Sequence, residues 1–264
     1  MRLRKEKEIF MKRELRPRKK KSRALIIALL LAVSSGALIW NCKDRIAVLA
    51  KQYRAESEEE GIDFAYWMEI NRDVCAWLKV PGTRIDYPVV QSITEADNYY
   101  LTHDIYQDEN IYGAVFIEKS NLSDFTNPNT IIYGHHMTDG SMFGDLTKFE
   151  EREFFEEHQE FMVYLPGETR RYEITAAYRY PAEHLLSAFD FSTEEQTAKY
   201  CGLVPEFAVT YGGYAREGME LRAPFVTLST CTSDNRSFRF LVQGRLADVK
   251  PRKEAVKLLE RSEQ

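Results

Sequence analysis

Short strand-like segments separated by turn signals fill the chain from about residue 76 to residue 246. Most are rich in β-branched and aromatic residues, and Pro81-Gly82 and Pro166-Gly167 each separate two neighbouring segments. The predicted strands cover residues 76–80, 85–90, 114–118, 130–134, 161–165, 171–180, 225–230 and 236–246. Short strands in this number and at this spacing predict a mainly β fold, a closed or nearly closed eight-stranded barrel with helical insertions.

Apolar residues at helical spacing predict helices over residues 41–61, 63–71, 141–157 and 192–203. The first is a predicted stalk rich in Ala, Arg and Glu. In the third, Phe143, Leu146 and Phe149 recur every three residues. Ser192 and Glu195 have the spacing of a capping box, so the fourth helix is expected to begin at Ser192.

The N-terminal segment differs from the rest of the chain in charge. Residues 1–23 carry 12 Lys and Arg against 3 Glu, a net charge of +9, which leaves 24 basic and 38 acidic residues, or −14, for the remainder. Residues 24–42 then contain no charged side chain over 19 positions. At 1.5 Å per residue such a helix is just long enough to cross the hydrocarbon layer of a membrane. The preceding positive charge predicts a cytoplasmic N-terminus and an extracellular remainder.

Three other interpretations of this segment fit less well. A nucleic-acid-binding arm would explain the basic residues but not the apolar run that follows them. A cleaved signal peptide would use the small residues 34–37 as its processing site, and a buried core helix would not have such unequal polar flanks. We expect an uncleaved anchor, because the basic region is long and the apolar run continues to Trp40.

The four cysteines are Cys42, Cys75, Cys201 and Cys231, and no two of them are spaced as CxxC. The pattern therefore supports neither a thioredoxin-like redox site nor a zinc knuckle. An exported domain could pair four cysteines, but a domain of this size does not need disulfides to be stable. We expect free thiols, with Cys75 and Cys201 in structural positions.

Cys231 ends a strand-like run, and the turn-like residues 233–235 separate it from a second run that contains Arg239. Two adjacent strands joined in this way would bring Cys231 and Arg239 close together. A guanidinium favours the reactive thiolate and neutralises an oxyanion that forms when the thiolate attacks a carbonyl. The alternative, on these residues alone, is a buried apolar cysteine and a surface arginine.

A second candidate segment, residues 129–137, is a strong strand that ends in Tyr-Gly and is followed by His135 and His136. Histidine supplies the acid that a leaving amine needs near neutral pH. A histidine pair could also bind a metal ion. There is no HExxH motif, and Asp139, the nearest carboxylate, sits beside Gly140 like a turn residue. No metal is therefore expected.

Three segments together resemble the catalytic segments of the sortases, and of class B in particular. They are IIYGHHM (131–137), TLSTC (227–231) and RFLV (239–242), in the family's order of histidine, cysteine and arginine. Residues 71–91, 97–104 and 129–146 are similar to class B sequence almost continuously, so the likeness covers about residues 60–247. It implies a sortase-type closed eight-stranded β-barrel, preceded by N-terminal helices and one transmembrane helix.

The resemblance also implies roles for individual residues. It identifies Cys231 as the nucleophile, His135 as the general acid/base and Arg239 as the stabiliser of the transition state. It places Leu101, Tyr133, Ser229 and Thr230 in the groove that binds the substrate peptide. No metal and no organic cofactor are implied.

Three positions depart from the family pattern. Thr232-Ser233 follow the cysteine where the family often has an aromatic or acidic residue, and Asp97-Asn98 are shifted by one residue from the usual spacing before Tyr99. Cys75 occupies a position that usually holds a small apolar residue, which favours a place in the core.

The activity implied is that of a cysteine transpeptidase of the cysteine endopeptidase type. Such an enzyme cleaves a C-terminal sorting signal, NPxT-like for class B, of an exported protein through a thioester on Cys231. It then transfers the acyl group to an amine of the cell-wall precursor or of a pilin. The implied partners are those substrates and the membrane lipid around the anchor, with no nucleic acid.

The corresponding domain organisation is a basic cytoplasmic head (1–23), a transmembrane signal anchor (24–42), a helical stalk with N-terminal helices (43–70), a catalytic β-barrel (71–250) and a charged C-terminal tail (251–264). The expected location is the membrane of a Gram-positive cell, with a single pass and an extracellular catalytic domain.

Other classes of protein fit less well. In a papain-like protease the cysteine precedes the histidine and opens a helix, and a caspase-like enzyme would carry a QAC sequence that this chain lacks. A surface-anchored β-barrel binding module, in which Cys231 has no chemical role, and a cysteine protease that only hydrolyses are the alternatives that stay open.

Overall fold

The structure, a computed structural model, describes residues 62–231 and 237–252. The predicted basic head, transmembrane anchor and stalk lie outside these residues, as do residues 253–264 of the predicted tail. Among the described residues, no helix is long and apolar enough to cross a membrane.

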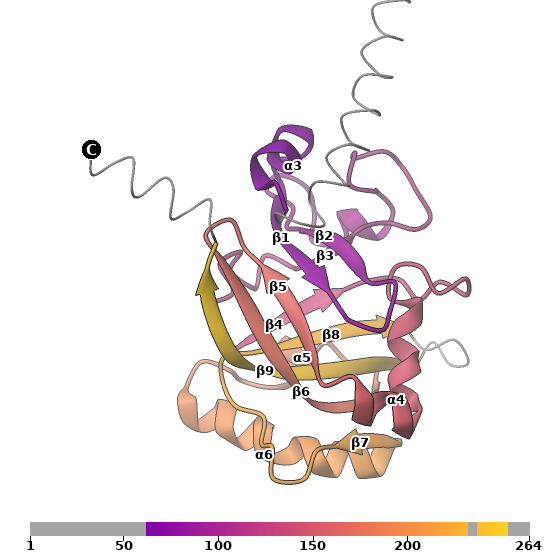
Figure 1. The fold of residues 1–264 in the computed structure, drawn as a ribbon, viewed down its shortest axis with the longest axis vertical. Coiled ribbons are helices and arrows are strands. Elements are labelled where there is room, and N and C mark those ends of the chain that lie inside the picture. The colour runs from indigo at the N-terminus through magenta and orange to yellow at the C-terminus, as the bar shows by residue number, and fades with distance from the viewer. Residues whose placement is uncertain (1–61, 232–236, 253–264) are drawn as a thin grey trace, which may run out of the picture. The chain divides into compact units, whose positions relative to one another are not determined.

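Eight strands close into a barrel (Figure 1), in the hydrogen-bonded order β5-β1-β2-β3-β4-β8-β9-β6 and back to β5. They are β1 (Val74–Lys79), β2 (Asp86–Val90), β3 (Val115–Phe116), β4 (Asn129–Tyr133), β5 (Glu160–Tyr164), β6 (Glu168–Pro181), β8 (Phe225–Cys231) and β9 (Phe238–Pro251). A further short strand, β7 (Gly213–Ala215), pairs with β6 outside this ring. The predicted closed eight-stranded barrel is confirmed, and β7 was not predicted.

The barrel has an apolar interior because side chains alternate along its strands. In β1 and β5 buried residues alternate with more exposed ones, as expected of strands with one face in a core. Leu78, Val89, Phe161 and Val163 are among the fully buried interior residues. The interior is thus a packed core and not a pore.

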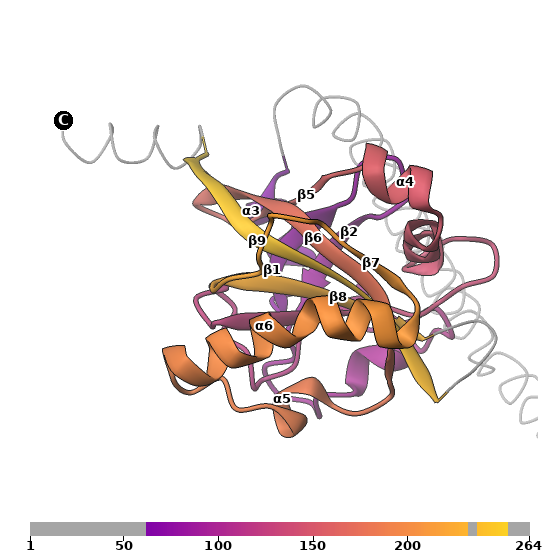
Figure 2. The same ribbon diagram turned by 90° about the horizontal axis from the view of Figure 1, so that it is seen from below.

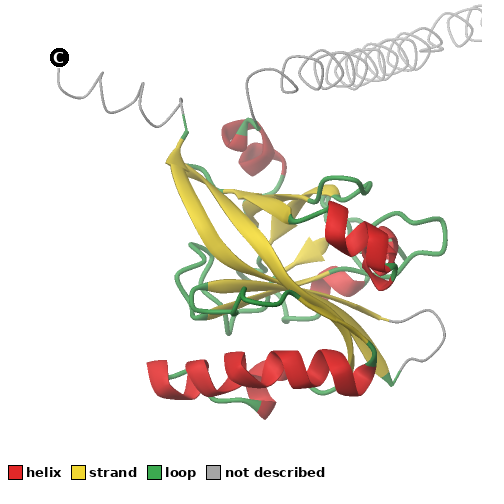
Figure 3. Cartoon of the chain, turned by 60° about the horizontal axis from the view of Figure 1, so that its bottom comes forward, coloured by secondary structure: helices red, strands yellow, loops and turns green. Residues whose placement is uncertain are grey.

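One long helix, α6 (Glu194–Tyr211), covers the outer face of β6, β8 and β9 (Figures 2 and 3). Tyr200 and Val204 of α6 pack with Ile131 of β4 and Leu241 of β9 in a second apolar cluster. This cover explains why four of the five residues of β4 are buried instead of every second one. Both faces of the strand that leads to the histidine pair are therefore held by packing.

A buried polar network ties α6 to the strands beneath it. Gln243, fully buried in β9, donates through Nε2 to Tyr200 Oη (2.8 Å) and Thr227 Oγ1 (2.9 Å) and accepts from Tyr178 Oη (3.0 Å). Thr227 in turn donates to Asn129 Oδ1 at 2.9 Å. These bonds join α6, β4, β6, β8 and β9, and buried hydrogen bonds of this kind favour one arrangement of the elements they join.

The other helices within residues 62–231 and 237–252 are short. They are α3 (Phe64–Ile70), η1 (Tyr99–Leu101), η2 (Gly144–Glu150), α4 (Arg152–Glu157) and α5 (Leu185–Ala188). Helix α3 begins after Asp63, whose side chain accepts from Tyr66 N at 2.9 Å, and agrees with the predicted helix over 63–71.

The prediction of one helix over residues 141–157 is wrong, because the segment holds the 3₁₀ helix η2 and the α-helix α4 instead. The physical reason lies in the spacing of Phe143, Leu146 and Phe149, which are all fully buried. A repeat of three matches the three residues per turn of a 3₁₀ helix and drifts around an α-helix. Extended backbone at Glu151 then separates the two.

Both predicted ends of the fourth helix are also wrong. Thr193, and not Ser192, caps α6, with its hydroxyl accepting from Gln196 N at 3.2 Å. The helix continues past the predicted end at 203, through Pro205 to Tyr211. Local sequence at Pro205 favours a break, but packing of the apolar face beyond it outweighs one lost hydrogen bond.

Candidate active site

The strand register brings the backbone of the three predicted catalytic residues to one end of adjacent strands. Cys231 at the end of β8 pairs with Arg239 at the start of β9, as predicted for a hairpin. In the parallel pair β4 and β8, Tyr133 is opposite Ser229, and Gly134 N donates to Ser229 O at 3.2 Å. His135 lies two residues beyond Tyr133 and Cys231 two beyond Ser229. Both residues therefore follow closely on the last paired residues of β4 and β8.

His135 is oriented by a backbone carbonyl. Its Nε2 lies 2.6 Å from Leu101 O, and because a carbonyl oxygen only accepts, Nε2 carries the proton in this contact. The other ring nitrogen, Nδ1, is then the one that can take up a proton. The carbonyl of His135 accepts from Phe143 N at 2.9 Å. Main-chain groups on both sides thus fix the position of the imidazole and the strand end that carries it.

Gly134, between Tyr133 and His135, has a steric role. A Cβ atom at this position would lie 2.7 Å from Cγ of Phe143, closer than such atoms approach in proteins. The glycine lets the Phe143 ring pack directly against the strand end. This contact explains the Tyr-Gly-His order in terms of packing, since any larger residue would displace the backbone of His135.

His136, the second histidine, takes a different direction. Its backbone forms an isolated β-bridge with Met142, and it is not among the described residues that line the cavity beside His135. In the described part of the chain no three His, Cys, Asp or Glu side chains converge as metal ligands would. Of the two histidines, His135 is therefore the one that the structure places at this cavity.

A cavity of about 360 Å³ opens beside the end of β4 and β8. Every predicted site residue whose side chain is described lines it: Leu101, Tyr133, His135, Ser229, Thr230 and Arg239. Its other wall comes from the end of β6 and the connection to α5, residues 180–185, and Phe116 and Glu118 complete it. A groove of this size, next to the end of β8, suits an extended peptide of a few residues.

Tyr133 provides a neutral polar group in this cavity. Its ring stacks on Phe116, with centroids 5.4 Å apart. Burial raises the pKa of the Tyr133 hydroxyl above its usual value, the Glu118 carboxylate raises the pKa further, and the Arg239 guanidinium lowers it. The phenol therefore stays protonated at neutral pH, between a negative charge on one side and a positive charge on the other.

Ser229 and Thr230 lie on the catalytic strand and are nearly inaccessible, at 4% and 2% exposure. Thr230 Oγ1 has no hydrogen-bond partner among the described residues. Buried hydroxyl groups without partners are uncommon in folded proteins.

Residue-by-residue reasoning on the sequence missed Glu118, His184 and the wall formed by residues 180–185. Each lines the cavity, although residues 118 and 184 are far from the catalytic segments along the chain. No local pattern marks them, because the closure of the barrel and the path of the chain after β6 bring them to the site. A carboxylate as the last residue of the predicted strand 114–118 was the one available signal.

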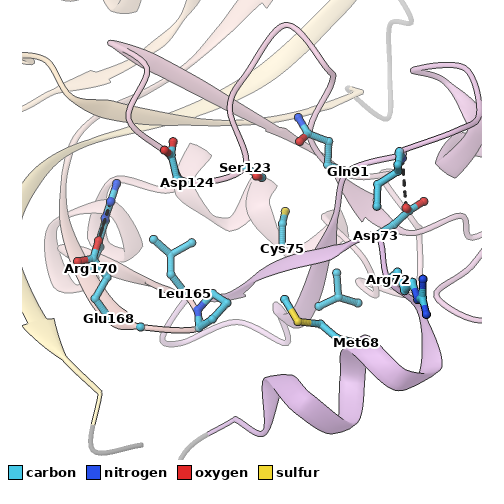
Figure 4. Close-up of a pocket in the computed structure, with 14 residues that line it drawn as sticks. Met68, Arg72, Asp73, Cys75, Gln91, Ser123, Asp124, Leu165, Glu168 and Arg170 are labelled. Atoms are coloured by element: carbon cyan, nitrogen blue, oxygen red, sulfur yellow. Dashed lines mark hydrogen bonds and ion pairs between the residues drawn. The ribbon is translucent and has the colours of Figure 1, made fainter. Parts of the chain in front are cut away.

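A second cavity, of about 550 Å³, contains Cys75 (Figure 4). Its lining residue Glu168 pairs with Pro251, at the opposite end of β9 from Arg239. Cys75 Sγ is 3.5 Å from Val89 O, and burial raises the pKa of this thiol to about 12. A thiol with that pKa is not a nucleophile at neutral pH. The prediction of a structural Cys75 is consistent with this geometry.

Cys201 is buried on the inner face of α6, in the apolar cluster between that helix and the barrel. Burial raises the pKa of its thiol to about 11. Cys75 and Cys201 are both free cysteines. Neither has the electropositive, accessible surroundings that activate a thiol.

Comparison with known proteins agrees with this fold. Residues 78–247, more than half of the chain, match the family model of the sortase domain. Sortase B of Listeria monocytogenes is 33% identical over 181 residues, which cover 67% of this chain and 71% of the relative.

Two solved structures are similar as well. A mutant form of Clostridium perfringens sortase B has a TM-score of 0.63 at 28% identity and covers 75% of this chain and 89% of the solved one. A Streptococcus pyogenes class B sortase involved in pilus biogenesis has a TM-score of 0.59 at 30% identity and covers 71% and 99%. The chain therefore belongs to the sortase family. Its class is B, and its relatives imply a cysteine transpeptidase.

Proposed function

We propose that the protein is a membrane-anchored cysteine transpeptidase that cleaves an NPxT-like C-terminal sorting signal of exported proteins. The acyl group passes to Cys231 as a thioester and then to an amine of the cell-wall precursor or of a pilin. The observation that supports this best is the pairing of Cys231 with Arg239, beside a peptide-sized cavity that His135 lines.

The first half of the reaction forms the thioester. The Cys231 thiolate attacks the carbonyl carbon of the scissile peptide bond, and the electron pair of the C=O moves to oxygen. Arg239 stabilises this oxyanion by charge and hydrogen bonding. Protonated His135 gives its proton to the leaving nitrogen, so that the C–N bond breaks and the amine departs. The acyl group is left as a thioester with neutral His135 beside it.

The second half reverses these roles. An acceptor amine attacks the thioester carbonyl, neutral His135 takes a proton from the attacking nitrogen, and the Cys231 thiolate leaves. Splitting the exchange in this way replaces one difficult step by two easier ones. Because His135 is held by Leu101 O at Nε2, proton transfer is assigned to Nδ1.

The cavity supports the assignment of the substrate as an extended peptide. Leu101 contributes an apolar side chain that is 38% exposed, while Tyr133, Ser229 and Thr230 contribute hydroxyl groups. The site thus offers one apolar contact and several hydrogen-bonding groups along a short groove. This is what a short polar signal that contains a proline requires.

The proposed acceptor amine and the proposed membrane location are supported by different observations. The likeness to a class B sortase involved in pilus biogenesis supports a pilin lysine as one acceptor, and the amine of a cell-wall precursor is the other. The net charge of +9 over residues 1–23, followed by 19 uncharged residues, supports a single membrane pass with the catalytic domain outside.

The test uses the full chain in detergent micelles with a library of pentapeptide signals, each with and without amines of both acceptor types. We expect an acyl-enzyme at Cys231 by mass spectrometry for NPxT-like members, and amide products when an amine is present. Hydrolysis with no amide product would identify a protease. Absence of any acyl-enzyme, with full reactivity of all thiols to alkylation only after unfolding, would favour the binding module.

A further inference from the structure

We propose that Glu118 and His184 form a clasp that positions one wall of the cavity for peptide binding. The inference rests on the proposed function, because the cavity is the site to which we assign the substrate. It concerns positioning residues, which act through the shape of the groove and not on the reacting atoms.

The clasp joins two segments that are 66 residues apart in the chain. His184 Nε2 lies 2.5 Å from Glu118 Oε2, and both residues line the cavity. Their side chains are 39% and 21% exposed, so the contact lies at the mouth of the groove and is partly shielded from water. A short contact between imidazole and carboxylate is a charge-assisted hydrogen bond, of the stronger kind.

The Glu118 side of the clasp is rigid. Gln91 Nε2 donates to both Glu118 O (2.9 Å) and Asn121 O (2.7 Å), and Asn121 N donates to Glu118 O at 3.0 Å. Asn121 then bonds β4, through Ile131 N (2.9 Å) and Asn129 O (2.8 Å). Gln91 belongs to the wall of the second cavity, where Figure 4 shows it. The Glu118 carboxylate therefore belongs to a turn that is hydrogen-bonded to the end of β2 and to β4.

The His184 side belongs to the short connection between β6 and α5. Ser187 N and Ala188 N each donate to His184 O at 2.9 Å, and Ser187 Oγ lies 3.1 Å from His184 Nδ1. Leu185, next in the chain, is 4% exposed and packs in the apolar cluster beneath α6. His184 is thus the side chain by which this connection bonds the opposite rim of the cavity.

The neutral imidazole satisfies both of its contacts. With the proton on Nε2 it donates to Glu118, and Nδ1 accepts from the Ser187 hydroxyl. Protonation keeps the bond to Glu118. The clasp therefore does not require a charged histidine.

The consequence of the clasp is local. Exposed ion pairs contribute little to global stability. In the described part of the chain, the same wall is also tied to the start of β9, where Ala182 N donates to Ser237 O at 2.8 Å. Without the clasp, residues 182–188 would sample wider positions, and a peptide would have to order them on binding. The free-energy cost of this ordering would weaken peptide binding and would leave the rate of the chemical step unchanged.

The experiment compares His184→Ala, Glu118→Ala, the double variant and Glu118→Gln in the full chain, with Lys79→Ala as the matched control. Lys79 makes an exposed ion pair with Asp86 (3.2 Å) and does not line either cavity. Hydrogen exchange needs no substrate, and we expect it to be roughly tenfold faster for amides of 182–189 in both single variants, with β4 amides unchanged. The control should leave both sets unchanged.

Steady-state kinetics supply the second readout. We expect KM for the signal peptide to rise by about fivefold or more with kcat within about twofold, and Glu118→Gln to be intermediate. The double variant should be no worse than either single variant, because both remove the same contact. Unchanged exchange at 182–189, or a fall in kcat with KM unaltered, would overturn the clasp. A wild-type protein that cleaves no signal would refute the proposed function, while the exchange measurement still decides the clasp.

Discussion

At the scale of single residues, adjacent side chains in the site have distinct surroundings. His135 lines the cavity and bonds Leu101 O, whereas His136 bridges to Met142. Two residues of identical chemistry can therefore be tested against each other as an internal control.

We expect His135→Ala to lose on the order of a hundredfold or more in the rate of thioester formation, because it removes the general acid. His136→Ala should lose little. Single-turnover appearance of the acyl-enzyme, followed by mass spectrometry, measures both. Equal losses would indicate a shared structural role, and a greater loss at His136 would mean that the register is misassigned by one residue.

The cysteines allow a second comparison at this scale. Burial raises the pKa of the Cys75 thiol to about 12 and that of the Cys201 thiol to about 11, so neither forms a thiolate at neutral pH. Cys231→Ala should abolish peptide cleavage, while Cys75→Ala and Cys201→Ala should keep most of it. The turnover of a fluorogenic signal peptide measures the activity of each variant. Substantial activity in Cys231→Ala would refute the assignment of Cys231 as the nucleophile.

At the scale of elements, an ion-pair bracket holds η2 to the turn between β1 and β2. Asp145, 5% exposed, accepts from Arg84 N (3.0 Å) and from the Arg84 guanidinium, and Lys148 Nζ is 3.1 Å away. These contacts lower the pKa of Asp145 to about 2, with the Arg84 side chain as the largest cause. The bracket supports the segment that follows His135, because Phe143 lies between His135 and Asp145 in the sequence.

Asp145→Asn should lower the free energy of unfolding at pH 7 by about 1 kcal/mol, since its partners are largely exposed and screened. The folded pKa is below the unfolded one, so this stability is present above about pH 4 and is lost as the pH falls toward 2. Urea unfolding at pH 7 and at pH 3 measures the gap between wild type and variant.

The difference in the free energy of unfolding between wild type and Asp145→Asn should be larger at pH 7 than at pH 3. Glu156→Gln, which removes an exposed ion pair with Arg152 within α4, is the control and should cost less than about 0.5 kcal/mol. A gap that does not narrow at low pH would show that the Asp145 charge is not what stabilises η2.

At the scale of the whole molecule, charge is distributed unevenly along the sequence, with a basic N-terminal segment and an acidic remainder. The first 23 residues carry +9 and the remaining chain −14. Such a division suits an anchor that keeps its basic end in the cytoplasm, with an acidic domain outside.

We expect protease added to intact protoplasts to digest the part of the chain beyond residue 42 and to leave residues 1–23 protected. Antibodies against tags at each end, read on immunoblots, distinguish the two parts. Protection of the C-terminal tag under these conditions would overturn the proposed topology. A variant in which the basic residues of the head are replaced by Gln should insert with mixed orientation, because the charge bias is lost.

What the sequence determined by itself is local in physical origin. Alternation, turn residues and β-branched runs predicted the eight barrel strands, because side-chain period and backbone preference act over a few residues. The order of the histidine, cysteine and arginine segments was also readable, and the strand register then placed Cys231 opposite Arg239. The roles of these residues stay predictions.

Tertiary structure decided the features that depend on distant contacts. The path of α6 through Pro205 and the fixed turn at Glu118 each follow from packing against elements far away in the sequence. The wall of the cavity that carries His184 lies 66 residues from Glu118 along the chain, and no short-range preference encodes that proximity. Closing the barrel brings the two together, because hydrogen bonding around the ring fixes positions that local sequence leaves free.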